Sequence, residues 1–381
     1  MKKFEVMTKI YFGESALDRL LALDAKRAFV ICDQFTVSSG LIRQVTERLD
    51  RAKVDYQLFS DVVPDPPKEK VVSGVTAMMS FKPDILIALG GGSAMDLAKS
   101  VRKVGQSVDA SCFPYLVAIP TTSGTGSEVT SFSVITDNEK KIKLPLVGED
   151  LTPDEAILDV ELVKSVPPTI TADTGMDVMT HAFESYVSIN NNEFSGALAE
   201  KAVEICGQFL LRSYADNNDL HARSKMHVAS CLAGLAFNSS SLGLCHGMAH
   251  QLGAVFHIPH GRANAILLPY IVEYNSTINK NSKSRDVYPP CVRKYCNLAK
   301  ILGVSNLNEI TTIRALVSYL QFTCKEMNIP LNISSLGCVS EGEYMAQVDA
   351  MAEAAMKDTC TATNPRKPTI EEVAALYRYI W

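Results

Sequence analysis

The first third of the chain alternates short hydrophobic runs with segments whose hydrophobic residues recur every three or four positions. The runs, rich in valine, isoleucine and leucine, predict strands, and the periodic segments predict helices. The predicted strands cover residues 28–32, 54–58, 85–89 and 115–119. A helix capped by Ser38 or Ser39 and another over 71–79 lie between them. This alternation is typical of a parallel sheet with helices on both faces, so we predict an α/β, Rossmann-like dinucleotide domain.

The pattern changes at the proline pair 167–168. Short β-like runs near 133–136, 143–147 and 156–158 precede it, whereas the later periodic segments repeat every three or four residues and predict helices. These predicted helices lie near 171–187, 195–214, 224–237, 241–256, 262–274 and 312–327. We therefore expect an α/β domain over 1–166 and an all-helical C-terminal domain over 167–381.

A glycine-rich turn follows the third predicted strand directly, with Gly90, Gly91, Gly92 and Ser93 preceding a helix. Glycines let the backbone approach a pyrophosphate, and the first N–H groups of a helix favour its negative charge. The usual GxGxxG pattern is not met, because Met95 occupies the third glycine position. The alternative interpretation is a tight strand-to-helix turn without a ligand.

A second loop, PTTSGTGSEVT at 120–130, follows the fourth strand and concentrates hydroxyl side chains. It suits contacts with a ribose or an amide, although its hydroxyls can equally satisfy their own backbone. Asp33 ends the first predicted strand, where a carboxylate can accept hydrogen bonds from an adenosine ribose and repel a 2′-phosphate. That reading favours NAD over NADP, and a surface aspartate without a ligand is the alternative.

The helical part carries a second group of chemically suited residues. Asp177 and His181 are one helical turn apart, so a carboxylate oxygen and an imidazole nitrogen can converge on one ion. His246 and His250 have the same spacing, and His260 follows soon after. Three imidazoles and a carboxylate suit Fe²⁺ or Zn²⁺. Spacing alone does not select the ligands, because each histidine taken singly is more often an ordinary core or surface residue.

Charge and cysteine usage exclude several classes. The net charge is -5 and the isoelectric point is about 5.9, with both signs interspersed, so no nucleic-acid partner is expected. Ten cysteines without a CxxC pair indicate reduced thiols in a reducing compartment. We find no secretory signal at the first residues and no apolar run of membrane-spanning length. A cytoplasmic protein without membrane contact is expected.

The motifs together resemble the iron-containing alcohol dehydrogenase family over essentially the whole chain. The resemblance rests on GGGSAMDLAK at 90–99, PTTSGTGSEVT at 120–130, AILDVEL at 156–162, GMDVMTHAFESYVS at 175–188, HGMAHQLG at 246–253 and HIPHGRANA at 257–265. Within the family the chain looks most like the 1-propanol dehydrogenases of propanediol-utilisation microcompartments. The resemblance implies an N-terminal NAD-binding domain, a helical metal-binding domain and an active site in the cleft between them.

The resemblance also assigns residues. It implies that the metal ligands are Asp177, His181, His246 and His260. It implies coenzyme contacts from Asp33, Gly91, Gly92, Ser93, Thr121, Thr122, Thr125 and Lys143, with Lys141 as an alternative to Lys143. His250 is similar to a family histidine near the substrate that is not a ligand, and we interpret it as a proton relay because it is titratable near neutral pH.

The activity implied is an NAD-linked, metal-dependent interconversion of short primary alcohols and aldehydes, with hydride transfer at a metal-held oxygen and with propanal and 1-propanol preferred. Fe²⁺ is the expected ion and Zn²⁺ the alternative. Lactaldehyde, ethanol or 4-hydroxybutyrate are alternative substrates. The family also implies a homodimer, with microcompartment shell proteins or enzymes as further partners. Two other readings are a metal-dependent hydrolase that holds a substrate phosphate at the glycine turn, and a nucleotide-binding assembly component without catalysis.

Overall fold

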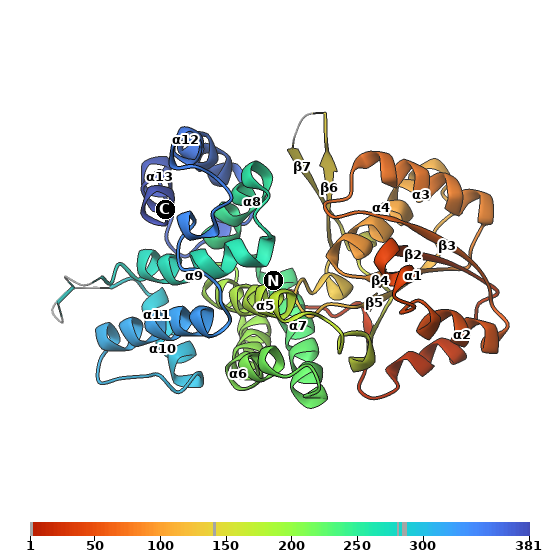
Figure 1. Ribbon diagram of the computed structural model, residues 1–381, viewed down its shortest axis with the longest axis horizontal. Helices are drawn as coiled ribbons and strands as arrows, with labels where there is room; N and C mark the ends of the chain where they lie inside the picture. Colours follow the sequence, from red (N-terminus) through yellow and green to blue (C-terminus); the bar gives the residue numbers. More distant parts are fainter. Residues whose placement is uncertain (1–2, 140–141, 280–281, 284–287) are drawn as a thin grey trace. The chain divides into compact units, whose positions relative to one another are not determined.

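The computed structural model of the protein describes residues 3–139, 142–279, 282–283 and 288–381 (Figure 1). The chain divides into two compact units, Met1–Val166 and Pro167–Trp381. Every strand of the described residues lies in the first unit, and the second unit is built from helices. The predicted fold class, a parallel α/β sheet followed by an all-helical region, is therefore confirmed.

The first unit contains a six-stranded sheet whose neighbouring strands all run parallel. In spatial order the strands are β1 (Lys9–Phe12), β8 (Glu155–Leu158), β5 (Tyr115–Pro120), β4 (Ile85–Gly90), β2 (Arg27–Asp33) and β3 (Asp55–Val62). A separate antiparallel pair consists of β6 (Phe132–Asp137) and β7 (Ile142–Val147). From β2 the chain first adds β3 on one side and then adds β4 and β5 on the other side. Parallel sheets bind ligands where the strand order reverses in this way, at the carboxyl ends of the two strands concerned, here β2 and β4.

Helices cover both faces of this sheet, because successive residues of a buried strand point to opposite sides. Val30 of β2 packs in one hydrophobic cluster with Leu49 of α2. Ile31 packs in a second cluster with Val75 of α3 and Leu97 of α4. The helices concerned are α2 (Arg43–Ala52), α3 (Lys68–Phe81) and α4 (Gly92–Val108). Figure 1 shows α3 and α4 on one side of the sheet and α2 on the other.

The helix expected from Ser38 or Ser39 is interrupted, and that capping prediction is wrong. A short helix α1 (Gln34–Ser38) comes first, and α2 begins only at Arg43. The side chain of Asp33 caps α1 by accepting a hydrogen bond from the backbone N–H of Thr36. The carboxylate of Asp33, at the end of the strand, therefore caps the first helix in place of a serine.

The second unit surrounds a long helix, α5 (Pro168–Val187), whose residues from Thr171 to Val187 are almost all buried. Proline at its first position is compatible with helix initiation, because that N–H would have no partner within the helix. Helices α6, α7 and α9 pack against α5. The remaining helices are α6 (Glu193–Ala215), α7 (Leu220–Ser240), α8 (Leu244–Phe256), α9 (His260–Ser276), α10 (Cys291–Ile301), α11 (Glu309–Glu326), α12 (Glu341–Lys357) and α13 (Ile370–Tyr379).

Three of these helices, α10, α12 and α13, were not predicted from the sequence. Two of them carry a readable start signal, because Ser340 with Glu343 and Thr369 with Glu372 form capping boxes. The helical patterns that follow are interrupted by alanine and charged residues, which weaken hydrophobic periodicity without weakening the helix. Local capping chemistry was thus the better guide in this region.

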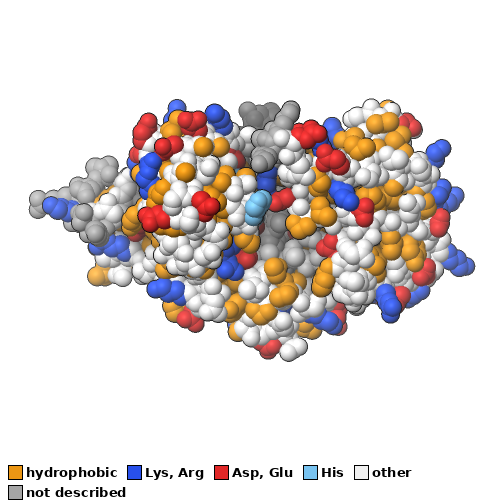
Figure 2. All heavy atoms as spheres, turned by 45° about the horizontal axis from the view of Figure 1, so that its top comes forward, with side chains coloured by type: hydrophobic (Ala, Val, Ile, Leu, Met, Phe, Trp, Pro, Cys, Tyr) orange, Lys and Arg blue, Asp and Glu red, His pale blue; other side chains and the backbone are white. Residues whose placement is uncertain are grey.

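The surface carries both charge signs, and Figure 2 shows Lys and Arg side chains interspersed with Asp and Glu side chains over the face in view. All ten cysteines are free thiols. Among the described residues, no single helix combines the length and apolar composition needed to cross a membrane. One pair of helices, Leu220–Ser240 with Leu244–Phe256, passes that test by length and composition, but it is bent by 107°.

Candidate metal centre and coenzyme loops

Helix α5 presents two of the proposed ligands on one buried face. Asp177 and His181 are four positions apart, which places their side chains one turn apart along the helix. Their side chains are only 4–5% exposed. A carboxylate and an imidazole so deeply buried need partners that hold them in place, because unpaired buried polar groups are costly.

The other two ligands come from the starts of two further helices. His246 lies in the first turn of α8, and His260 is the first residue of α9, after Pro259. Helix α9 approaches α5 closely at Gly261, where an added Cβ would lie 2.2 Å from the backbone oxygen of Asp173. Any larger residue at 261 would separate the two helices. Glycine therefore allows His260 to reach the face that carries Asp177.

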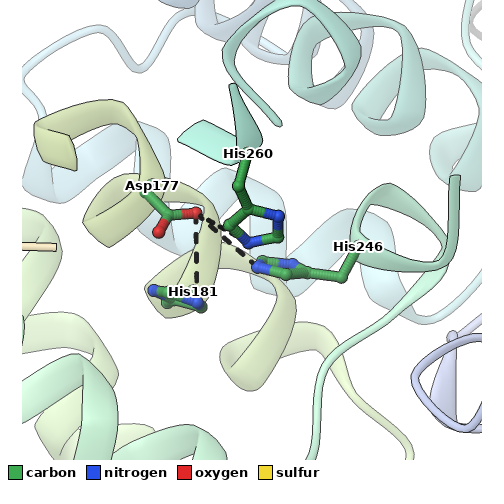
Figure 3. Close-up of side chains that lie close together, drawn as sticks. All are labelled: Asp177, His181, His246 and His260. Atoms are coloured by element: carbon green, nitrogen blue, oxygen red, sulfur yellow. Dashed lines mark ion pairs between the residues drawn. The ribbon is translucent and has the colours of Figure 1, made fainter. Parts of the chain in front are cut away.

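The four side chains point toward one another (Figure 3). Their ligand atoms all lie within 4.8 Å of each other. Measured from Oδ1 of Asp177, the Nε2 atoms of His181, His246 and His260 lie at 4.0, 3.7 and 3.5 Å. The rings of His181 and His246 stack with centroids 4.6 Å apart. Three members are buried, whereas the side chain of His260 is 39% exposed, so the cluster is accessible from one side.

Asn264 provides a test of whether this cluster suits a cation. Its amide nitrogen lies 2.8 Å from Oδ1 of Asp177, 3.1 Å from Nε2 of His246 and 3.2 Å from Nε2 of His260. An amide has two hydrogens and cannot satisfy three acceptors. Its own Oδ1 is buried without a hydrogen-bond partner in the described part of the chain. The acceptor atoms of the cluster therefore outnumber the hydrogens that face them. One carboxylate and three imidazoles with unshared lone pairs fit a bound Fe²⁺ or Zn²⁺.

Glu184 lies behind His246 on the side away from the cluster. Its Oε2 is 2.6 Å from Nδ1 of His246. Burial raises the pKa of Glu184 to about 8, and backbone N–H groups of Cys245, His246 and Gly243 oppose that rise. Burial also lowers the pKa of His246 far below its ordinary value, with the neighbouring histidines acting in the same direction. The neutral imidazole that metal binding requires is therefore favoured in the folded protein.

His250 lies one turn after His246 on α8 and beside the cluster rather than in it. Its ring stacks on that of His260, with centroids 5.3 Å apart. Its Nδ1 is 2.8 Å from Oδ2 of Asp358. The ligand atoms of His250, Asp358 and Cys360 also lie within 4.8 Å of one another. The geometry thus places His250 in a group separate from the four converging side chains.

The two loops of the first unit pack directly against each other. A Cβ at Gly91 would lie 3.3 Å from Oγ1 of Thr122, and a Cβ at Gly92 would lie 2.9 Å from Cγ2 of Thr125. The backbone N–H of Thr121 donates to the carbonyl of Gly90 at 2.9 Å. Because β4 and β5 are neighbours, the fold brings together loops that are about thirty residues apart in the sequence.

The other proposed coenzyme residues lie at different places in the same unit. Ser93 is the second residue of α4, in the first turn of a helix, which is a favourable position for an anion. Asp33 ends β2, next to β4 in the sheet. Lys143 lies on β7, and its ammonium nitrogen contacts Oδ1 of Asp65 at 2.6 Å rather than the two loops. Lys141, the alternative to Lys143, lies outside the described residues.

Comparison with known proteins identifies the family. Residues 7–160 match the family described as iron-containing alcohol dehydrogenase, and residues 171–381 match the C-terminal region of the same family. The chain belongs to the iron-containing alcohol dehydrogenase family. It is accordingly an oxidoreductase, and the expected enzyme class is confirmed.

Two known dehydrogenases are similar to this chain along nearly their full length. The 1-propanol dehydrogenase PduQ of Citrobacter freundii is 43% identical over 374 residues, covering 96% of each chain. The NADPH-dependent butanol dehydrogenase of Clostridium saccharobutylicum is 37% identical, covering 100% of this chain and 98% of its own.

Solved structures of similar proteins have the same fold. A 1,3-propanediol oxidoreductase superposes with a TM-score of 0.90 at 31% identity, covering 100% of both chains. A sulfoacetaldehyde reductase from Bifidobacterium kashiwanohense, solved in complex with NAD⁺, superposes with a TM-score of 0.86 at 25% identity, covering 100% of this chain and 98% of its own.

Sequence reasoning overlooked three residues around the cluster. Glu184 lies three positions after His181 and seven after Asp177, so the helical spacing that identified those two also points to it. Asn264 has the same four-residue spacing from His260. Asp358 carries no such signal, because it lies 108 residues after its partner.

Proposed function

We propose that this alcohol dehydrogenase interconverts short primary alcohols and aldehydes, with 1-propanol and propanal as its preferred pair, and that it uses NAD(H). The observation that carries the proposal is the convergence of one carboxylate and three imidazoles on a point open to one side. The 43% identity to a 1-propanol dehydrogenase supports the choice of substrate. Lactaldehyde, ethanol and 4-hydroxybutyrate are the competing substrates that the experiment below includes.

The residues that would hold the ion are Asp177, His181, His246 and His260. A divalent ion, Fe²⁺ in preference to Zn²⁺, would supply a Lewis acid for the substrate oxygen. Asp177 contributes the only negative charge of the set and offsets part of the charge of the ion. Because His260 is the one partly exposed member, the substrate enters beside it.

The residues that would hold the coenzyme are Asp33, Gly91, Gly92, Ser93, Thr121, Thr122 and Thr125. A nicotinamide coenzyme would supply the hydride acceptor or donor. Glycines 91 and 92 let the side chains of Thr122 and Thr125 pack against the start of α4, where the first N–H groups would bind a pyrophosphate. Asp33 would accept hydrogen bonds from the ribose. Lys143 completes the set from β7, provided that it exchanges its contact with Asp65.

Proton transfer falls to His250. Its Nδ1 contacts Asp358, its ring stacks on that of His260, and its side chain is 30% exposed to solvent. An imidazole held in this way can take up a proton at its other nitrogen and pass it outward. We further propose, from the family resemblance, a cytoplasmic homodimer that is encapsulated in a bacterial microcompartment with shell proteins or enzymes as partners.

The test combines metal analysis of anaerobically purified protein with NADH-dependent reduction of propanal, acetaldehyde, lactaldehyde and succinic semialdehyde. We expect about one equivalent of iron and the highest kcat/KM with propanal. His260→Ala should lose both metal and activity, whereas His221→Ala, a change at an exposed histidine of α7, should keep both. Wild-type protein that binds no divalent metal under anaerobic conditions would contradict the proposal. Zinc with full activity would change only the identity of the ion.

A further inference from the structure

Glu184 contacts both a side chain of the candidate metal centre and the backbone at the start of α8. It lies on α5, with a side chain only 3% exposed. Its Oε1 accepts a hydrogen bond from the backbone N–H of Cys245 at 2.6 Å. Its Oε2 lies 2.6 Å from Nδ1 of His246 and accepts from the backbone N–H of the same residue at 3.3 Å. The carboxyl group of Glu184 therefore accepts from two backbone N–H groups and lies within hydrogen-bond distance of one ring nitrogen of His246.

We propose that Glu184 is a positioning residue for the metal centre, which holds the imidazole of His246 with its proton on Nδ1 and its Nε2 lone pair toward Asp177. This inference rests on the proposed metal site and adds the group that orients one of its ligands. A neutral imidazole has one donor and one acceptor nitrogen, so fixing the proton on Nδ1 leaves Nε2 free to bind. Outer carboxylates that act on ligating histidines in this way raise their basicity.

The surrounding backbone is arranged to let the carboxylate come this close. Gly243 precedes α8, and a Cβ there would lie 2.7 Å from Oε1 of Glu184. The first N–H groups of α8 have no partners within the helix, and Glu184 accepts from those of Cys245 and His246. Asn364 accepts from the N–H of Leu244. Glu184 thus holds the backbone and the ring of His246 together.

The substitution Glu184→Gln distinguishes the positioning role from a role in packing alone, because it keeps the shape of the side chain. A glutamine of the same shape has one acceptor oxygen and one NH₂ group, and the NH₂ group must face a donor. If it faces Nδ1 of His246, the imidazole proton moves to Nε2 and the lone pair needed by the ion is lost. If it faces the N–H of Cys245, the first turn of α8 is displaced. Either arrangement weakens metal binding.

The experiment measures binding of Co²⁺ to metal-free protein by visible absorption, together with thermal unfolding with and without Zn²⁺. We expect Glu184→Gln to bind Co²⁺ about 10- to 100-fold more weakly than wild type. The increase in Tm on adding Zn²⁺ should shrink in parallel, because that increase reports affinity for the folded state. Glu200→Gln is the matched control, since Glu200 accepts a hydrogen bond from Tyr186 in the same unit. It should bind like wild type.

The outcomes separate the inference from the proposed function. Wild-type protein that fails to bind Co²⁺ would overturn the metal site itself. If wild type and Glu184→Gln bind Co²⁺ with equal affinity, only the positioning role is overturned. The same conclusion follows if the substitution lowers Tm equally with and without Zn²⁺. If Glu184→Gln does not fold, ¹⁵N spectra of the Zn²⁺-loaded wild type decide. A proton on Nδ1 of His246 is expected, and metal on Nδ1 would overturn the inference.

Discussion

Nδ1 of His250 lies 2.8 Å from Oδ2 of Asp358, although 108 residues separate them in the sequence. The other oxygen of Asp358 accepts from the backbone N–H of Cys360 at 2.9 Å, so the carboxylate is held at both ends. Although burial favours the neutral acid, the hydrogen bonds from His250 and Cys360 keep the pKa of Asp358 below its ordinary value. An ionised carboxylate therefore orients the imidazole that we assign to proton transfer.

This pair predicts how turnover responds to substitution. His250→Ala should reduce kcat for propanal reduction by about 100-fold, the lower end of general acid–base effects, and should change its pH profile. Asp358→Asn should give an intermediate loss, because the imidazole remains but is no longer held by a charge. The measurement is kcat with NADH as a function of pH. Asp349→Asn, at an exposed ion pair on α12, is the control. Wild-type turnover and pH profile in His250→Ala would show that the relay assignment is wrong.

Asp33 predicts the choice of coenzyme. Its carboxylate at the end of β2 would repel a 2′-phosphate, so wild type should use NADH far better than NADPH. Asp33→Asn keeps the cap on α1, because asparagine also accepts from the N–H of Thr36, but it removes the charge. The preference for NADH in kcat/KM should fall by roughly 10- to 100-fold. Asp55→Asn, at the opposite end of the neighbouring strand, should leave it unchanged. Equal use of both coenzymes by wild type would contradict the role of Asp33.

The contact between the two loops predicts a substitution and its repair. Gly92→Ala would place a Cβ 2.9 Å from Cγ2 of Thr125 and push the loops apart, at a cost of about 1–3 kcal/mol. NADH should then bind about tenfold more weakly in a fluorescence titration, while the metal content stays constant. Thr125→Ser removes the methyl group and keeps the oxygen that accepts from Ser127. The double variant should recover most of the affinity, and a double variant as weak as Gly92→Ala would refute the steric explanation.

His227 predicts how stability depends on pH. It is buried on α7, and burial lowers its pKa from 6.5 to about 4. The unfolded chain therefore binds a proton more readily, so the contribution to stability is complete above about pH 6.5 and is lost as the pH falls toward 4. Between pH 7 and pH 5 the loss is about 2 kcal/mol. His227→Gln should remove it in urea unfolding of metal-free protein. His221→Gln, at an exposed histidine of the same helix, should not.

Local patterns in the sequence determined the strand-to-helix turns and two of the four side chains of the candidate metal centre. Asp177 and His181 could be paired in advance, because a helix places residues four apart on one face. The alternation of hydrophobic runs determined the α/β sheet, since a parallel sheet needs strands buried on both faces. The same local rule reaches Glu184 and Asn264, but spacing does not say what their side chains contact. A helix position becomes informative only when the neighbouring helix is known.

Only the tertiary structure decided which histidines meet. His246 and His260 lie at the starts of separate helices, and they reach Asp177 because α9 packs against both α5 and α8. The close approach of α9 to α5 occurs at Gly261. The exclusion of His250 from the cluster depends equally on Asp358, which no spacing rule connects to it. Such contacts follow from how whole helices pack in three dimensions. Because hydrophobic packing is not directional, the sequence pattern of each helix does not say which neighbour it meets. Sequence therefore supplied the ligand types and the first pair, whereas the fold selected the partners and their orientation.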